Sequence, residues 1–259
     1  AKRQLTEPVI FERGDATNRG KAVKRHFLSV LDPEQREFTR KNSGRLELAE
    51  QITRPENPLT PRVFVNRVWG NLLGSHLVGT PSDFGLQGLR PTHPELLDHL
   101  AWNFVHGQDW SMKELIRSIV NSRTYQLRSV VPSARRPETA SNETKDIENR
   151  WLWRANRKPL SLEQLRDSVL FVSGNLEDEI YGRSVHLWDT DYSHRRGVYG
   201  FVNRVNLDPT LRAFNCPSPN QTQAIRPEGT VPQQALFLMN SPIIIDQAKS
   251  LVENDGFRS

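Results

Sequence analysis

The chain of 259 residues contains one cysteine, Cys216, and no uninterrupted apolar run long enough to span a membrane. A single cysteine excludes a disulfide within the chain, and no Cys-x-x-Cys-His motif is present for covalent haem attachment. Cys216 stands between Asn215 and Pro217 in a turn-rich segment without a nearby histidine. We therefore expect a structural role for this thiol rather than a nucleophilic one.

Concentrated positive charge is also missing. The net charge is +5, yet no run of lysine and arginine is longer than two residues. Nucleic-acid-binding chains usually gather such charge into a tract or a face, so we expect no nucleic-acid partner. The first four residues, Ala1 to Gln4, lead into no apolar stretch, so no signal peptide is recognised here.

What the chain does contain is helical patterning over most of its length. The composition, with 36% hydrophobic and 25% charged residues, is ordinary for a soluble protein, and 259 residues can bury a substantial core. We predict a mainly α fold, a multi-helix orthogonal or bundle-like domain with a small β-hairpin element. The expected organisation is one domain over residues 1–259, or two lobes, 1–128 and 149–259, joined by the polar segment 129–148.

The first strong helix is predicted to begin at Thr60 as its N-cap, with Pro61 in the first turn, and to stop at Gly74. Its apolar residues cover much of the circumference, which is typical of a buried helix. Asn66 and Arg67 therefore fall in apolar surroundings. We expect them to hydrogen-bond loop carbonyls, and the alternative is a role in ligand binding.

A serine or threonine three residues before a glutamate or glutamine predicts the start of a helix, and this spacing occurs at several further places in the chain. This spacing predicts helices that begin after Ser111, with an end near Tyr125, and after Ser161, with an end at Gly174. A shorter helix is predicted to open at Ser43. The pairs with this spacing are Thr92 with Glu95, Ser111 with Glu114, Ser161 with Gln164, and Thr230 with Gln233.

Two groups of candidate catalytic residues stand in the first half of the chain. Asp83 lies in an Asp-Phe-Gly sequence, but no glycine-rich loop or His-Arg-Asp motif accompanies it, so a kinase site is rejected. Asp83 is expected to accept amide hydrogen bonds in a turn or to pair with an arginine. His93 and Glu95 are expected to serve capping and surface pairing, with acid–base chemistry as the alternative. We predict no metal site.

Residues 182–206 are predicted to form a short β-hairpin, because β-type residues gather at 185–188 and 198–202. Aromatic rings beside acids, histidines and arginines are what a carbohydrate or anion site uses. Internal salt bridges are the alternative, and paired aspartates would suit glycoside chemistry. The candidates are Trp188, Asp189, Asp191, Tyr192, His194, Arg195 and Arg196. Arg226, in a later polar loop, is expected to reach inward and is a further ligand-binding candidate.

Several short motifs occur in an order that is specific to one family. They are Asn57-Pro58-Leu59-Thr60, Val65-Asn66-Arg67-Val68-Trp69, Ser82-Asp83-Phe84-Gly85, Thr92-His93-Pro94-Glu95-Leu96-Leu97-Asp98 and Trp110-Ser111-Met112-Lys113. Weaker matches extend from Arg13 to Asn240. In these motifs the chain resembles the planctomycete-specific uncharacterised domain of PSD1 type, which is found C-terminal to cytochrome-c-like modules in large bacterial proteins.

The resemblance implies an extracytoplasmic setting, with any export signal upstream of this segment. It implies that c-type haem is carried by other domains of the same parent protein and that no cofactor belongs to this chain. It carries no established activity. We therefore expect a binding or assembly module that docks on those haem-carrying domains. The alternative is a polysaccharide-acting enzyme that uses acids and histidines from segments 83–99 and 186–196.

Overall fold

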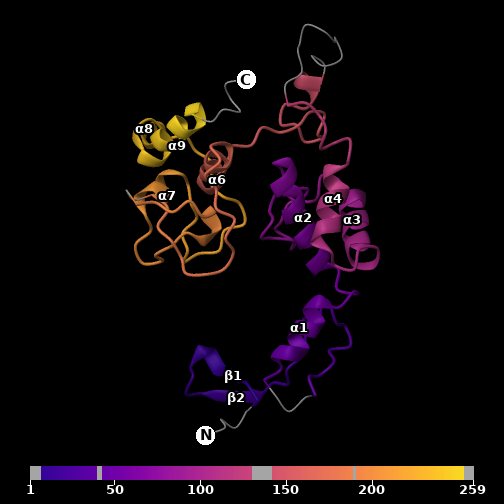
Figure 1. Cartoon of the computed structure of the whole chain (residues 1–259). Coiled ribbons are helices and arrows are strands. Elements are labelled where there is room, and N and C mark those ends of the chain that lie inside the picture. The colour runs from indigo at the N-terminus through magenta and orange to yellow at the C-terminus, as the bar shows by residue number, and fades with distance from the viewer. Residues whose placement is uncertain (1–6, 40–42, 130–141, 189–190, 254–259) are drawn as a thin grey trace. The chain divides into compact units, whose positions relative to one another are not determined.

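The computed structural model describes residues 7–39, 43–129, 142–188 and 191–253. Part of the predicted connector 129–148, the candidate Asp189 and the last six residues lie outside this described part. The chain divides into two compact units, Ala1–Asn156 and Arg157–Ser259, each treated by itself below (Figure 1). Helices dominate both units, and the described residues form one sheet of two strands, which confirms the predicted mainly α fold with a small hairpin.

The hairpin, however, does not form where the sequence placed it. Strands β1 (Val9–Phe11) and β2 (Arg19–Ala22) pair antiparallel near the start of the first unit. At 185–202 the described residues have only isolated parallel bridges, Val185 with Gly200 and Arg195 with Glu177, next to a 3-10 turn, η3 (Gly197–Tyr199). A few backbone hydrogen bonds, together with side-chain donors, satisfy the backbone of that segment in place of a strand ladder.

The junction between α1 (Arg45–Thr53) and α2 (Leu59–Leu73) is built on Asn57. Its amide nitrogen donates to the carbonyl of Ile52 at 3.0 Å, and its Oδ1 accepts the N–H of Leu59 at 3.1 Å. Thr60 is not the N-cap, because its hydroxyl donates to Ile52 O instead. The predicted stop at Gly74 is confirmed, with φ of 79° in the left-handed region.

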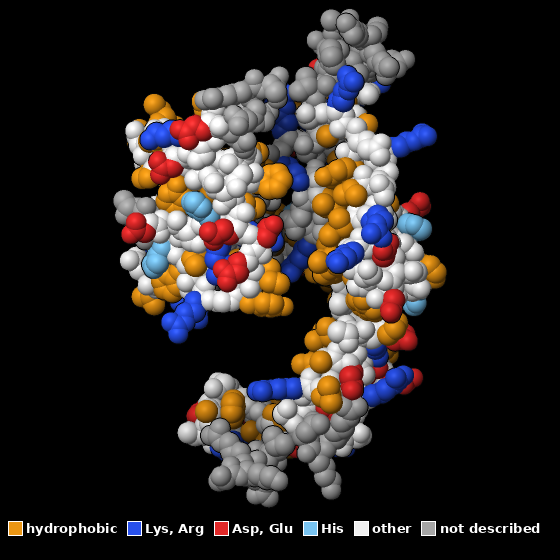
Figure 2. Space-filling view, in the orientation of Figure 1, with side chains coloured by type: hydrophobic (Ala, Val, Ile, Leu, Met, Phe, Trp, Pro, Cys, Tyr) orange, Lys and Arg blue, Asp and Glu red, His pale blue; other side chains and the backbone are white. Residues whose placement is uncertain are grey.

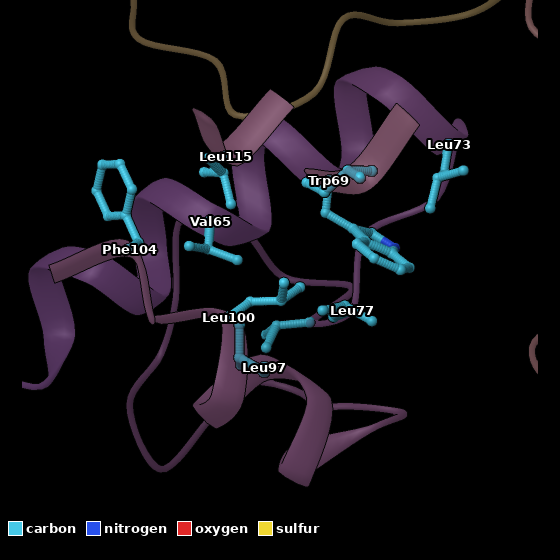
Figure 3. Close-up of a cluster of buried hydrophobic side chains, with 10 residues drawn as sticks. Val65, Trp69, Leu73, Leu77, Leu97, Leu100, Phe104 and Leu115 are labelled. Atoms are coloured by element: carbon cyan, nitrogen blue, oxygen red, sulfur yellow. The ribbon is translucent and has the colours of Figure 1, made fainter. Parts of the chain in front are cut away.

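Helices α2, α3 (Pro94–His106) and α4 (Met112–Val120) enclose the core of the first unit. Figure 3 shows Val65, Leu100 and Leu115 among the side chains that meet between these helices. The buried cluster consists of Val65, Trp69, Leu73, Leu77, Val78, Leu97, Leu100, Phe104, Leu115 and Ile119. The candidate site residues of the first unit are therefore held on or beside a packed three-helix core.

The helix starts in the first unit are only partly as predicted. Ser111 caps α4 by accepting the N–H of Glu114 at 3.3 Å. The capping box at Thr92 is wrong, because α3 begins at Pro94 with His93 in the N-cap position and no side-chain cap. The predicted end near Tyr125 is also wrong: α4 stops at Val120, and a turn closed by side-chain and backbone bonds follows.

The second unit contains α6 (Leu162–Val172), α7 (Pro209–Ala213), α8 (Pro232–Asn240) and α9 (Pro242–Glu253). The capping box of Ser161 and Gln164 has both of its hydrogen bonds, and the chain leaves α6 at Gly174 with φ of 79°. Thr230 does not cap α8, whose N-cap is Val231. A small buried cluster of Leu162, Leu207 and Leu211 packs against Trp188 and Phe237.

Candidate functional site

The segment 185–200 of the second unit is held in place by Arg166 of α6. This side chain is only 1% exposed. Its guanidinium donates to the carbonyl oxygens of Leu187 at 3.4 Å, Arg195 at 2.8 Å and Ser193. A loop without a strand ladder leaves carbonyls unpaired, and the forked donors of one arginine satisfy several of them at once.

Asp167 completes this arrangement from the adjacent position of α6. Its Oδ1 accepts the N–H of Gly197 at 2.7 Å and lies 3.3 Å from Nη1 of Arg166. Side chains at neighbouring helix positions normally point in different directions. Arg166 and Asp167 do meet, because both side chains bend toward the same loop. Burial lowers the pKa of Arg166, and the Asp167 carboxylate partly opposes that effect.

Arg195, expected to bind ligand, turns inward instead and is 6% exposed. Its Nη1 donates to Arg183 O at 3.1 Å, and its Nη2 donates to the carbonyls of Glu179 and Tyr181. The guanidinium also lies 4.3 Å from the ring centroid of Tyr199. These partners use most of its donors, so the observed geometry supports a structural role.

A second buried network links α6 to α9 through Gln247, which is 2% exposed. Its Oε1 accepts from Ser173 Oγ at 2.6 Å and from Asn175 Nδ2 at 2.7 Å. Its Nε2 donates to the hydroxyl of Tyr192 at 3.1 Å, and that hydroxyl donates to Asp246 at 3.3 Å. Burial is the largest cause of the raised pKa of Tyr192.

The remaining candidates on this loop differ in exposure. Trp188 is partly buried, with its ring 5.8 Å from that of Phe237. Asp191 and Arg196 are exposed, and neither side chain makes a hydrogen bond or ion pair within the described residues. His194 is half-buried, and its ring lies 5.5 Å from that of Tyr192.

Arg226 reaches inward as predicted and joins the 214–229 loop to α6. Its Nη1 lies 2.8 Å from Oε2 of Glu163, while Nε and Nη2 donate to the carbonyls of Asn215 and Phe214. The Cys216 thiol lies 4.0 Å from the same carboxylate. Burial raises the pKa of Cys216, and the negative charge of Glu163 adds to this effect. The thiol therefore stays protonated, as suits a structural cysteine.

In the first unit, Asn66 acts as the sequence suggested. It is fully buried, donates to Val78 O at 3.1 Å and accepts the N–H of Val78 at 2.8 Å. Arg67 is not in apolar surroundings: it is exposed, because α2 buries positions 65, 66, 69, 70 and 73 and leaves position 67 outside. Asp83 accepts the N–H of Gly85 at 2.8 Å, which confirms its turn role.

His93 and Glu95 lie at the start of α3, with Glu95 exposed. Nδ1 of His93 is 2.9 Å from Thr92 Oγ1, and its ring makes a T-shaped contact with that of Trp151, with 5.2 Å between centroids. Trp151 is 63% exposed and belongs to a loop in which no site residue was predicted. The sequence Trp-Leu-Trp-Arg at 151–154 was the available signal, since exposed tryptophans favour binding surfaces.

Arg166 and Gln247 were also missed, although their positions carry a signal. Arg166 lies four residues from both Leu162 and Leu170, and Gln247 lies four residues after Ile243. Each therefore stands on the buried stripe of its helix. Polar side chains in such positions are normally fully hydrogen-bonded.

The candidate acids and histidines are shared between the two units: Asp83, His93 and Glu95 belong to the first, and Asp191 and His194 to the second. Over the described ranges, no three His, Cys, Asp or Glu side chains gather into a possible metal-binding group.

Among the described helices, none combines the length and the apolar character that crossing a membrane requires.

Comparison with known proteins gives a family but no characterised relative. No curated protein matches the chain, and no solved structure does. Residues 44–256, well over half of the chain, match PSD1, described as "Protein of unknown function (DUF1553)". The match includes α1 to α4 of the first unit and α6 to α9 of the second. The chain therefore belongs to the PSD1 (DUF1553) family of proteins of unknown function.

Proposed function

We propose that the chain is a binding and assembly module of a larger extracytoplasmic bacterial protein, and that it docks on the c-type haem domains of that protein. The observation that carries the proposal is helix α8, none of whose nine residues is buried. Leu236, Leu238 and Met239 are 57%, 39% and 72% exposed. A helix with so much uncovered apolar surface normally belongs to an interface.

Neighbouring elements extend this apolar surface. Helix α9 packs against α8 and exposes Ile245 at 40%. Figure 2 shows hydrophobic side chains scattered over the visible face of the molecule, beside charged ones. Burying such residues against a partner removes apolar area from water, which is the main driving force for association.

The arginines of the second unit also favour binding over catalysis. Arg166, Arg195 and Arg226 each donate to at least two backbone carbonyls of their own unit. A guanidinium held in this way is not available to clamp a substrate anion. The remaining exposed surface is suited to contact with another protein domain.

The proposal is tested by titrating the chain with the haem-carrying domain of its parent protein and following the haem absorbance or the sedimentation of the complex. We expect Leu236→Gln with Met239→Gln to weaken binding at least tenfold, because both replacements place polar groups in the interface. Val205→Gln is the control, since Val205 is 91% exposed in a loop of the same unit. Equal binding by the α8 variant and the control would reject this surface.

A further inference from the structure

A separate feature of the first unit is the loop 146–156, here called the tryptophan loop. Its turn is organised by Asp146, whose carboxylate accepts the N–H groups of Arg150 and Trp151, each at 2.8 Å. The backbone carbonyl of Asp146 accepts the indole N–H of Trp153 at 3.0 Å. Hydrogen bonds within the loop thus fix the backbone at Trp151 and the indole of Trp153.

Asn149 fixes the other half of the loop. It is 2% exposed, donates to Arg154 O and to Asn156 Oδ1 at 2.8 Å each, and accepts the N–H of Arg154 at 3.2 Å. Asn156 in turn donates to the carbonyl of Leu73, at the end of α2, at 3.0 Å. The loop is therefore anchored to the helical frame of its unit.

The backbone of the loop adopts a conformation that non-glycine residues rarely take. Asn149 and Leu152 both have φ of 54°, in the left-handed region. Such conformations cost free energy and tend to persist where function requires a defined geometry. Here they let Leu152 pack against the core while its neighbour Trp151 stays 63% exposed.

One aromatic ring of the loop lies beside a guanidinium group, and a second arginine is exposed next to Trp151 in the sequence. The Arg154 guanidinium carbon is 5.3 Å from the ring centroid of Trp153. Arg150 is exposed and makes no side-chain hydrogen bond or ion pair within the described part of the chain. The ring of His93 stands at 79° to that of Trp151, so the imidazole does not stack flat on the indole. Ring faces next to guanidinium groups suit a ligand with both an apolar face and a negative charge.

We propose that the tryptophan loop, together with His93, binds an acidic polysaccharide. A sugar ring stacks on Trp151, and a carboxylate or sulfate on that sugar pairs with Arg150 or Arg154. The pre-formed loop reduces the ordering cost of binding. A nucleic acid fits less well, because Glu148 is exposed in the same loop and no continuous basic tract accompanies it.

The test compares two tryptophans with the same exposure. Trp151 and Trp102 are both 63% exposed and both contact a histidine ring, but Trp102 lies on α3 outside the tryptophan loop. Titration calorimetry with galacturonate oligosaccharides and with sulfated dextran oligosaccharides measures binding. We expect Trp151→Ala to weaken binding at least tenfold and Trp102→Ala to leave it unchanged. Trp151→Phe, which keeps an aromatic ring, should stay within about threefold of the wild-type affinity.

The contribution of charge is tested with Arg150→Gln, matched by Arg90→Gln, which removes an exposed arginine from another loop. We expect only Arg150→Gln to weaken binding, and neutral dextran oligosaccharides to bind at least tenfold more weakly than acidic ones. The two acidic probes distinguish carboxylate from sulfate as the partner. Equal loss in both tryptophan variants, equal binding of neutral dextran, tighter binding of oligothymidylate, or no binding of either acidic probe would overturn the proposal.

Discussion

At the scale of single residues, arginine is the side chain that organises the second unit. Arg166 and Arg195 are buried, and Arg226 is half-buried, and each satisfies backbone carbonyls of irregular segments. Lysine could not replace them, because an ammonium group lacks the planar fork that reaches several carbonyls in fixed geometry. Loops without ladder partners need such donors, since an unpaired buried carbonyl is costly.

Replacing Arg166 should therefore destabilise the second unit strongly. We expect Arg166→Leu to lower the free energy of unfolding by about 3 kcal/mol, because charged hydrogen bonds to buried carbonyls are lost. Arg196→Leu is the matched control: Arg196 lies on the same loop but is exposed, and surface changes of this kind stay within about 0.5 kcal/mol. Chemical denaturation measures both. Similar midpoints for the two variants would contradict the role assigned to Arg166.

His76 makes the stability of the first unit depend on pH. Burial lowers the pKa of its imidazole below the ordinary 6.5, and the positive charge of Arg67 lowers it further. Between the folded-state pKa and 6.5 the unfolded chain binds more protons, so stability is lost as the pH falls through this window.

We expect the melting temperature to fall as the pH is lowered from neutral to about 5, and His76→Gln to reduce this slope. Arg67→Gln should reduce it less, because it removes the charge and leaves the burial. Melting curves recorded at several pH values measure the effect. An unchanged slope in His76→Gln would show that other groups cause the dependence.

At the scale of elements, α2 shows how packing can reverse a local preference. Gly70 lies inside this helix, where alanine would normally be better by about 1 kcal/mol. A Cβ at this position would stand 2.4 Å from Cδ2 and Nε2 of His76. The imidazole of His76 occupies the space that a Cβ at position 70 would need. Glycine therefore permits this close packing, although it is a poor helix former.

Gly70→Ala should for this reason destabilise the protein by about 1–2 kcal/mol, since the ring must be displaced from its site. In a His76→Ala background the same replacement should become stabilising by up to about 1 kcal/mol. A double-mutant cycle by chemical denaturation measures the coupling between the two positions. If Gly70→Ala changes the free energy of unfolding in the same direction in both backgrounds, the contact with His76 does not determine the effect of the replacement.

At the scale of the whole molecule, the family match runs through both compact units. Residues 44–256 include the three-helix core of the first unit and α6 to α9 of the second, while β1 and β2 precede the match. Each unit has its own buried cluster and its own uncovered side chains, such as Trp151 in the first and Met239 in the second. The two proposed interactions accordingly belong to different units and can fail independently.

The sequence by itself determined the local features that depend on near neighbours in the chain. The capping box at Ser161, the glycine stops at Gly74 and Gly174, and the turn at Asp83 involve partners within a few residues. The role of Asn66 was also predictable, because a polar side chain on a buried helix must find a backbone partner. The mainly α class followed from the same periodic patterns.

Only the tertiary structure decided which side chains replace a strand ladder at 185–200, because the donor, Arg166, lies 21 to 29 residues away from the carbonyls it binds. The hairpin was misplaced for this reason: β-type residues form strands only when a ladder partner is available. The tryptophan loop was missed because its anchor, the bond from Asn156 to Leu73, spans 83 residues. The helical period can show that a buried polar side chain needs partners, but not which distant residues supply them.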